Sequence, residues 1–86
     1  MKKLTLEQFR PLLEEVWGEF QKTDEELLKT DFYQDCQFDS IDFQDLFCVL
    51  YIRCDIAIDN QTLIKASFYK NPTVENFIKI CNKVGK

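Results

Sequence analysis

The chain of 86 residues has no histidine, only two glycines and two prolines, and no long apolar run. The missing histidine removes the commonest general base and argues against a self-contained hydrolase. Scarce glycine and proline argue against a β-sandwich or a collagen-like chain. No apolar stretch approaches the roughly 20 residues of a membrane span, and the segment after Lys2 and Lys3 lacks a signal-peptide core. We therefore expect a soluble cytoplasmic protein.

The cysteines are too scattered for an obvious metal site. None of them forms a CxxC pair, which is the ligand spacing typical of zinc sites. We therefore expect no bound metal. Disulfides persist mainly in oxidising compartments, and no leader toward such a compartment is evident. We interpret all four as free thiols that mostly serve as small apolar packing residues: Cys36, Cys48, Cys54 and Cys81.

The chain has enough large apolar side chains to form one hydrophobic core. Its residues are 45% hydrophobic and include eight Phe, three Tyr and Trp17, which excludes a disordered tail. The length allows a single domain over residues 1–86. The net charge of −4 makes nucleic acid an unfavourable partner.

The excess of acidic over basic residues is densest in the middle of the sequence. Between residues 39 and 60, the only base, Arg53, is set against Asp39, Asp42, Asp45, Asp55 and Asp59. After residue 60 the sign reverses, with several lysines against Glu75 alone. This pattern would steer a basic partner to the middle segment, although acidic residues on a helix also occur simply as a solvated face.

Apolar spacing predicts an N-terminal helix that opens with a capping box at Thr5 and Gln8. Pro11 predicts either a later helix start or a kink. The stripe that should face the core consists of Leu6, Phe9, Leu12, Leu13, Val16, Trp17 and Phe20.

A second strong helix should begin with Asp39 as the N-cap and Asp42 three residues later. Its expected inward face consists of Phe43, Leu46, Phe47, Leu50 and Cys54. The opposite face is less polar than a solvated helix needs, which indicates a contact surface. That face carries Gln44, Asp45, Cys48, Tyr51, Ile52 and Asp55.

The remaining segments are shorter. We predict barely one helical turn after Thr23, an ordered loop over residues 30–38, and a short third helix over Gln61–Tyr69 that buries Leu63, Ile64 and Phe68. Thr73 should cap a last helix. The apolar residues of that helix are Val74, Phe77, Ile78 and Cys81. Short connections between such segments favour a compact, all-α bundle.

The segment from Phe32 to Asp42 resembles the region around the carrier serine of acyl carrier proteins. That family shows Phe, two variable residues, Asp, Leu, Gly, one variable residue and Asp-Ser-Leu. Here Phe32, Asp35, Asp39 and Ser40 fall in register, and Ile41 replaces Leu. Cys36-Gln37 replaces Leu-Gly, so the loop must close with a side chain where glycine is usual. The similarity continues through Asp45-Leu46, Leu50, Asp55–Ile58, Thr73-Val74 and Phe77-Ile78.

The resemblance implies a four-helix bundle of acyl-carrier-protein type with a short third helix, which is a carrier and not an enzyme. A phosphopantetheinyl transferase (holo-acyl-carrier-protein synthase) would attach 4′-phosphopantetheine from coenzyme A to Ser40, with Asp39 engaging the transferase and its metal. The monomeric carrier would then hold acyl intermediates as thioesters for fatty-acid, polyketide or specialised lipid biosynthesis. Ketosynthase, acyltransferase or ligase enzymes would contact Asp42, Gln44, Asp45, Cys48, Tyr51, Ile52, Asp55, Ile58 and Asp59.

Two other interpretations stay open. Asp39-Ser40-x-Asp42 on its own is typical of any helix start, and the altered residues Cys36 and Gln37 are compatible with an unmodified, carrier-like interaction module. An aminoacyl or aryl carrier that works with an adenylating ligase would share the same bundle and serine.

Overall fold

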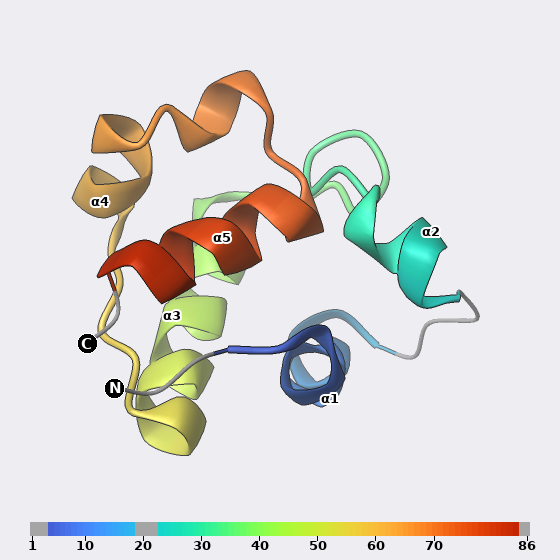
Figure 1. Cartoon of the computed structure of the whole chain (residues 1–86), viewed down its shortest axis with the longest axis horizontal. Coiled ribbons are helices and arrows are strands. Elements are labelled where there is room, and N and C mark those ends of the chain that lie inside the picture. The colour runs from blue at the N-terminus through green and yellow to red at the C-terminus, as the bar shows by residue number, and fades with distance from the viewer. Residues whose placement is uncertain (1–3, 19–22, 85–86) are drawn as a thin grey trace.

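The computed structural model describes residues 4–18 and 23–84, and these residues are mostly helical with no β-strand among them. The elements are α1 (Leu6–Trp17), α2 (Asp24–Leu28), α3 (Ser40–Cys54), α4 (Asn60–Lys65), the 3-10 helix η1 (Phe68–Lys70) and α5 (Val74–Val84). The predicted all-α class is therefore confirmed for the described part of the chain. α1 packs against α3, α2 packs against α5, and η1 contacts both α4 and α5. Figure 1 shows α5 running between α2 at one end of the molecule and α4 at the other.

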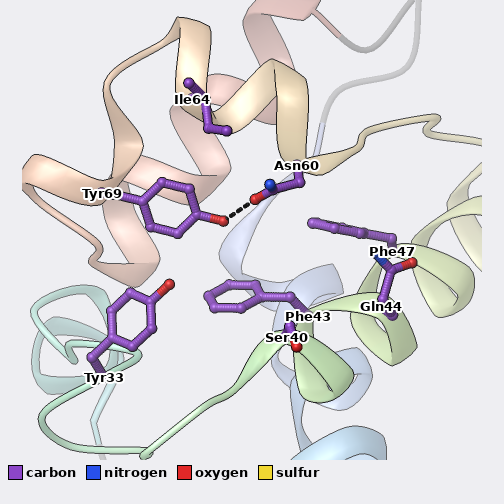
Figure 2. Close-up of a pocket in the computed structure, with 8 residues that line it drawn as sticks. All are labelled: Tyr33, Ser40, Phe43, Gln44, Phe47, Asn60, Ile64 and Tyr69. Carbon is purple, nitrogen blue, oxygen red and sulfur yellow. Dashed lines mark hydrogen bonds between the residues drawn. The ribbon is translucent and has the colours of Figure 1, made fainter.

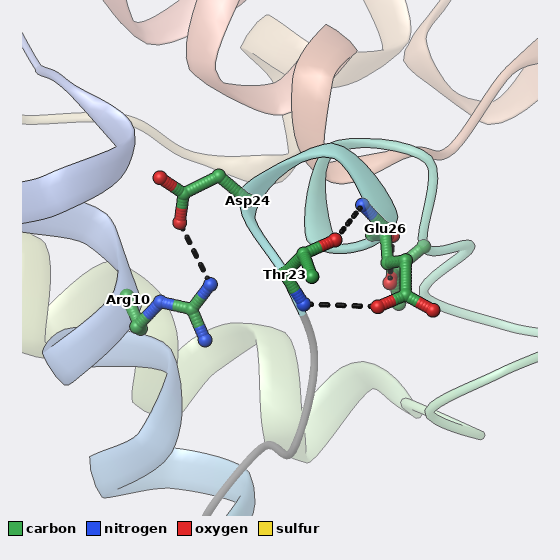
Figure 3. Close-up of polar contacts among 5 residues, drawn as sticks. Arg10, Thr23, Asp24 and Glu26 are labelled. Atoms are coloured by element: carbon green, nitrogen blue, oxygen red, sulfur yellow. Dashed lines mark hydrogen bonds and ion pairs between the residues drawn. The ribbon is translucent and has the colours of Figure 1, made fainter.

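Hydrogen bonds from nearby side chains determine where the helices begin. In a capping box, the N-cap side chain accepts a backbone N–H three residues on, and the side chain there bonds back to the N-cap. The predicted boxes at α1 and α3 are confirmed, as is Thr73 as the cap of α5. α2 carries a third box, drawn in Figure 3 beside the 2.9 Å ion pair that joins Arg10 of α1 to Asp24. The three boxes pair Thr5 with Gln8, Thr23 with Glu26, and Asp39 with Asp42.

The third helix differs from the prediction. α4 ends at Lys65, and Ser67 then adopts φ 59° and ψ 32° before η1 begins. A left-handed residue cannot continue a right-handed helix, so the expected single element is split in two. Leu63 and Phe68 are buried as expected, but Ile64 is 52% exposed, because the short α4 turns it outward.

α1 begins at Leu6 and contains Pro11, so the alternative of a later start is wrong. Pro11 lies on the exposed side of the helix, where water can reach the carbonyl that loses its amide partner. Phe9 and its neighbours Leu12 and Leu13 are buried, whereas Trp17, in the last turn, is 40% exposed. Leu6 and Val16 are partly buried and pack against the core, so the expected stripe is confirmed from Leu6 to Val16, and its last member, Phe20, lies outside the described residues.

Phe32, which lies in the ordered loop predicted for residues 30–38, is at the centre of the core and fully buried. Its ring centroid lies 5.1–5.9 Å from four other phenylalanine rings, which come from the same loop, α3, η1 and α5. These are Phe38, Phe43, Phe68 and Phe77. Aromatic pairs at this spacing add to the stabilisation that burial already provides. One side chain thus joins the loop and α3 to η1 and α5, which lie about 30 residues later in the sequence.

Two further contacts close the fold. The loop is tied to the start of α5, because the Phe32 amide donates to the Pro72 carbonyl at 2.9 Å and the Val74 amide to the Thr30 carbonyl at 3.0 Å. The Asn82 side chain accepts from the Leu4 amide and donates to the Leu4 carbonyl, joining residues 78 apart in sequence. None of the described helices is both long enough and apolar enough to cross a membrane.

Candidate functional site

Ser40 is the first residue of α3, and its side chain is exposed. Asp39 precedes it in an extended conformation, with φ −117° and ψ −173°. The Asp42 amide donates to Asp39 Oδ1 at 3.0 Å, and the Asp39 amide donates to Asp42 Oδ2 at 3.0 Å. This reciprocal pair fixes the point where the helix begins, and it therefore fixes the position from which the Ser40 hydroxyl reaches solvent.

The electrostatic field at the N-terminus of α3 favours a negative group near Ser40 but does not activate the Ser40 hydroxyl. The N-terminus of a helix such as α3, with 15 residues, stabilises an exposed anion by about 0.3–1 kcal/mol. That is too little to change the reactivity of an alcohol. The neighbouring Asp39 and Asp42 carboxylates each use an oxygen to hold the helix start. The helix N-terminus alone therefore favours a nearby negative group only weakly and does not make the Ser40 hydroxyl reactive.

The loop before Ser40 is held rigidly by its own polar groups. The Asp31 carboxylate accepts the amides of Tyr33 and Gln34 at 2.8 and 2.9 Å, while Asp35 Oδ2 accepts the Asp31 amide at 2.8 Å. Gln37 adopts a φ of 55°, in the left-handed region. We expected the loop to close with a side chain where glycine is usual. It does so at Gln37, which holds the turn in a strained conformation.

A pocket of about 410 Å³ lies beside Ser40, a volume within the range of small-molecule sites. Figure 2 shows its walls, which come from the loop, α3, α4 and η1. The lining residues are Tyr33, Ser40, Phe43, Gln44, Phe47, Asn60, Ile64 and Tyr69. Sequence reasoning placed only Ser40 and Gln44 in a functional site. Tyr33, Asn60 and Tyr69 were not among the predicted site residues, because they meet only once the chain has folded.

The pocket has a polar side formed by two tyrosines and an amide. The Tyr69 hydroxyl donates a hydrogen bond to Asn60 Oδ1. The Tyr33 ring lies 6.0 Å from the Tyr69 ring and 5.8 Å from that of Phe43. Partial burial, helped by the nearby Tyr69 hydroxyl, raises the pKa of Tyr33 to about 12. Tyr33 therefore remains a neutral phenol throughout the physiological pH range.

The outer face of α3 is exposed to solvent, as the helical spacing predicted. All six residues expected there are exposed: Gln44, Asp45, Cys48, Tyr51, Ile52 and Asp55. Ile52 is 77% exposed and Tyr51 61%, which is unusual for such large apolar side chains. We refer to these six residues as the outer face.

The other predicted contact residues differ from one another in exposure. Ile58 is only 7% exposed, because the extended segment after α3 turns Ile56 and Ile58 inward and Ala57 outward. Its expected role as a direct partner contact is therefore wrong. Asp59 is exposed but caps α4, and half-buried Asp42 belongs to the capping box of α3.

The cysteines are free thiols in different environments. Cys36 and Cys81 are buried, Cys54 is half-buried, and Cys48 is exposed on the outer face. Burial is the main cause that raises the pKa of Cys81 to about 12, so this thiol remains protonated. Within residues 4–18 and 23–84, no three Cys, Asp or Glu side chains gather as they would around a metal ion.

No protein-family model, curated protein or solved structure matches this chain. The function is therefore inferred from the residues around Ser40. They present an exposed hydroxyl at a helix N-terminus, with an aromatic pocket on one side and a partly apolar face along the same helix.

Proposed function

We propose that this chain is an acyl carrier protein whose Ser40 receives 4′-phosphopantetheine from coenzyme A. The observation that carries the proposal is the exposed Ser40 hydroxyl at the first residue of a capped helix, in the sequence context Asp39-Ser40-Ile41. The attached arm would supply a terminal thiol on which acyl groups are held as thioesters. In this proposal α1, α3, α4 and α5 are the four helices of the carrier bundle, and α2 is a short addition to the first connection.

The transfer itself is assigned to a separate phosphopantetheinyl transferase. Ser40 Oγ forms a bond to the phosphorus of the transferred group, and the bond within the coenzyme A diphosphate breaks. The electrons of that bond go to the departing 3′-phosphoadenosine 5′-phosphate, and the Ser40 proton goes to a base of the transferase. The chain has no histidine of its own, which agrees with a passive role for it in this step.

The residues around Ser40 fit such a group. The exposed hydroxyl leaves room for a phosphodiester in solvent, and the N-terminal amides of α3 favour its negative charge. Asp39 would engage the transferase and its metal while its Oδ1 atom keeps the cap. The outer face, with exposed Tyr51 and Ile52 among acidic residues, would bind the enzymes that act on the cargo.

The test is enzymatic loading followed by intact-mass measurement. We expect the wild type, incubated with coenzyme A, Mg²⁺ and a broad-specificity transferase, to gain the mass of one phosphopantetheine. Ser40→Ala should gain nothing and keep its helical circular dichroism. The only other serine is Ser67, which is left-handed, so Ser67→Gly is a matched control that should still load. An unmodified wild type, in a reaction that loads a known carrier, would contradict the proposal.

One observation also favours a second candidate, an interaction module that works without modification. The large exposed side chains of the outer face offer a docking surface that does not depend on Ser40. A partner captured equally by wild type and Ser40→Ala, from protein that gains no mass on loading, would support this candidate. Dependence of capture on loaded Ser40 would exclude it.

A further inference from the structure

We infer that a separate pocket, between the C-terminal ends of α4 and α5, binds the phosphate group of a small phosphorylated molecule. The volume of this pocket is about 350 Å³, and its lining residues are Thr62, Lys65, Ala66 and Lys83. None of these residues lines the pocket beside Ser40. The inference is independent of the proposed function, because it needs neither the Ser40 hydroxyl nor an attached arm.

The first support is that two lysines from different helices meet at this pocket. Lys65 is the last residue of α4, and Lys83 lies in the last turn of α5. Figure 1 shows the C-terminal end of α5, in dark red, on the same side of the molecule as α4. Two ammonium groups at one pocket repel each other, and an anion bound to both offsets that repulsion.

The second support is that neither lysine forms an ion pair with any residue that the structure describes. Both arginines of the chain, Arg10 and Arg53, do form such pairs, at 2.9 and 3.0 Å. Lys65 and Lys83 have no comparable contact with a described carboxylate, and the lining residues include no acid. The charges of the two lysines are therefore available to a ligand.

Asp59 is the acidic residue that Lys65 influences, since the charge of Lys65 helps to lower the pKa of Asp59. This carboxylate does not compete for the pocket, because it lines a different one and its Oδ1 atom accepts from the Thr62 amide and hydroxyl. The Thr62 hydroxyl has only one proton, so it has none left for a ligand. The two ammonium groups are therefore the side-chain donors of the pocket.

The positions of the two lysines determine which anion is favoured. A cation near a helix C-terminus is stabilised by the helix dipole, which explains one lysine at each end but not why the two ends share a pocket. The same dipoles oppose an incoming anion, so a singly charged group gains little there. A phosphate monoester carries a charge of about −1.5 to −2 at pH 7, and its oxygens can bind both flexible lysines at once.

The size of the pocket favours a phosphate that is attached to a larger group. A volume of about 350 Å³ lies at the lower end of the range for small-molecule sites and exceeds what inorganic phosphate needs. The Ala66 methyl group and the lysine stems supply apolar surface around the charged groups. We therefore expect a phosphate on an apolar ring to bind more tightly than inorganic phosphate.

The experiment titrates ¹⁵N-labelled protein with phenyl phosphate, inorganic phosphate or acetate, each at the same ionic strength set with sodium chloride. We expect saturable shifts of the Lys65, Ala66 and Lys83 amide resonances with both phosphates, and none with acetate. The N-terminus of α3 is a competing place for an anion. Shifts confined to residues 40–42, or no saturable shift with either phosphate, would overturn the inference, and equal binding of acetate would overturn the choice of phosphate.

Matched variants test the two lysines. Lys83→Gln and Lys65→Gln should each weaken the binding of phenyl phosphate about threefold, the loss expected for one exposed ion pair. Lys29→Gln removes the same charge at the exposed end of α2, on the other side of the molecule in Figure 1, and should bind as the wild type does. All three lysines are exposed, so we expect unchanged helical circular dichroism. Equal losses in all three variants would show that net charge attracts the anion, which would overturn the assignment of the pocket.

A last comparison distinguishes a free phosphorylated molecule from a lipid headgroup. Vesicles of phosphatidylcholine with phosphatidic acid present the same phosphate monoester on a membrane. We expect the wild type to sediment with them no more than the double variant Lys65→Gln/Lys83→Gln does, and sedimentation that depends on the two lysines would overturn the assignment to a small molecule. Ser40→Ala should bind phenyl phosphate as the wild type does, so this result and the loading result stand or fall separately.

Discussion

Gln37 stores backbone strain two residues before the capping box of α3. Its φ of 55° lies in a region that costs an L-residue about 1–2 kcal/mol and costs glycine almost nothing. The residue is also exposed, so its side chain gains little from packing. The turn therefore keeps its shape because the surrounding hydrogen bonds impose it.

We expect Gln37→Gly to raise the free energy of unfolding by up to about 1 kcal/mol. Relief of strain should exceed the extra chain entropy that glycine brings to the unfolded state, which is about 0.4–1 kcal/mol. In a domain of this size, 1 kcal/mol corresponds to a rise in Tm of roughly 4–8 °C. Gln34→Gly, in the same loop but without a positive φ, should not raise the Tm in thermal unfolding. Equal losses in both variants would contradict the strain argument.

The ionisation of Asp59 makes the stability of the fold depend on pH, and the direction of that dependence can be stated. The Thr62 amide and hydroxyl donate to its Oδ1 atom at 2.9 and 2.8 Å, which lowers the pKa of Asp59 below its ordinary value of 3.8. A group with a lowered pKa contributes stability that is complete above its unfolded pKa and is lost as the pH falls through its folded pKa.

The stability difference between wild type and Asp59→Asn should therefore be constant above about pH 5 and shrink in stronger acid. Asparagine keeps the cap geometry but has no charge to titrate. Urea unfolding of both proteins over this range measures the difference. A gap that widens as the pH falls would show that another group controls the acid response.

At the scale of elements, the sequence predicted what local chemistry determines. The boxes at Thr5 and Asp39 and the cap at Thr73 are short-range patterns, and they were confirmed. The break between α4 and η1 was missed because serine carries no sequence signal for the left-handed conformation that Ser67 adopts. The inward turn of Ile58 was missed because tertiary packing decides which face of a short extended segment is buried.

Only part of the candidate site could be predicted from the sequence. Ser40 and the outer face follow from the start and the period of one helix. The pocket joins four segments, and only the folded chain brings Tyr33, Asn60 and Tyr69 together. Periodicity in one helix carries no information about what lies opposite it.

The start of α3 allows the structural and the recognition roles of Asp39 to be separated. Asp39→Ala removes the cap and should cost about 1 kcal/mol of stability. Asp39→Asn keeps an N-cap acceptor, so we expect a stability change within about 0.5 kcal/mol together with slower loading of Ser40. Urea unfolding and loading rates measure the two effects. Asp45→Asn, on the outer face of the same helix, is the control for loss of one charge, and an equal slowing there would remove any special role for Asp39.

At the scale of the whole molecule, stability depends on the ring cluster around Phe32. Phe32→Leu should lower the free energy of unfolding by about 1–3 kcal/mol, because it leaves a void between four rings. Domains of this kind have only about 5–15 kcal/mol in total. Tyr51→Leu makes a comparable change at an exposed position and should cost less than about 0.5 kcal/mol. Chemical denaturation compares the two variants, and similar losses would mean that Phe32 is not the centre of the core.

The exposed sulfur of Cys48 has a practical consequence for work on the intact molecule. A maleimide or a colorimetric sulfhydryl reagent would react with Cys48 as well as with any sulfhydryl that loading introduces. In aerated buffer the same atom provides a route to covalent dimers that have nothing to do with recognition. A Cys48→Ala background removes both artefacts and lowers the reagent signal that remains before loading.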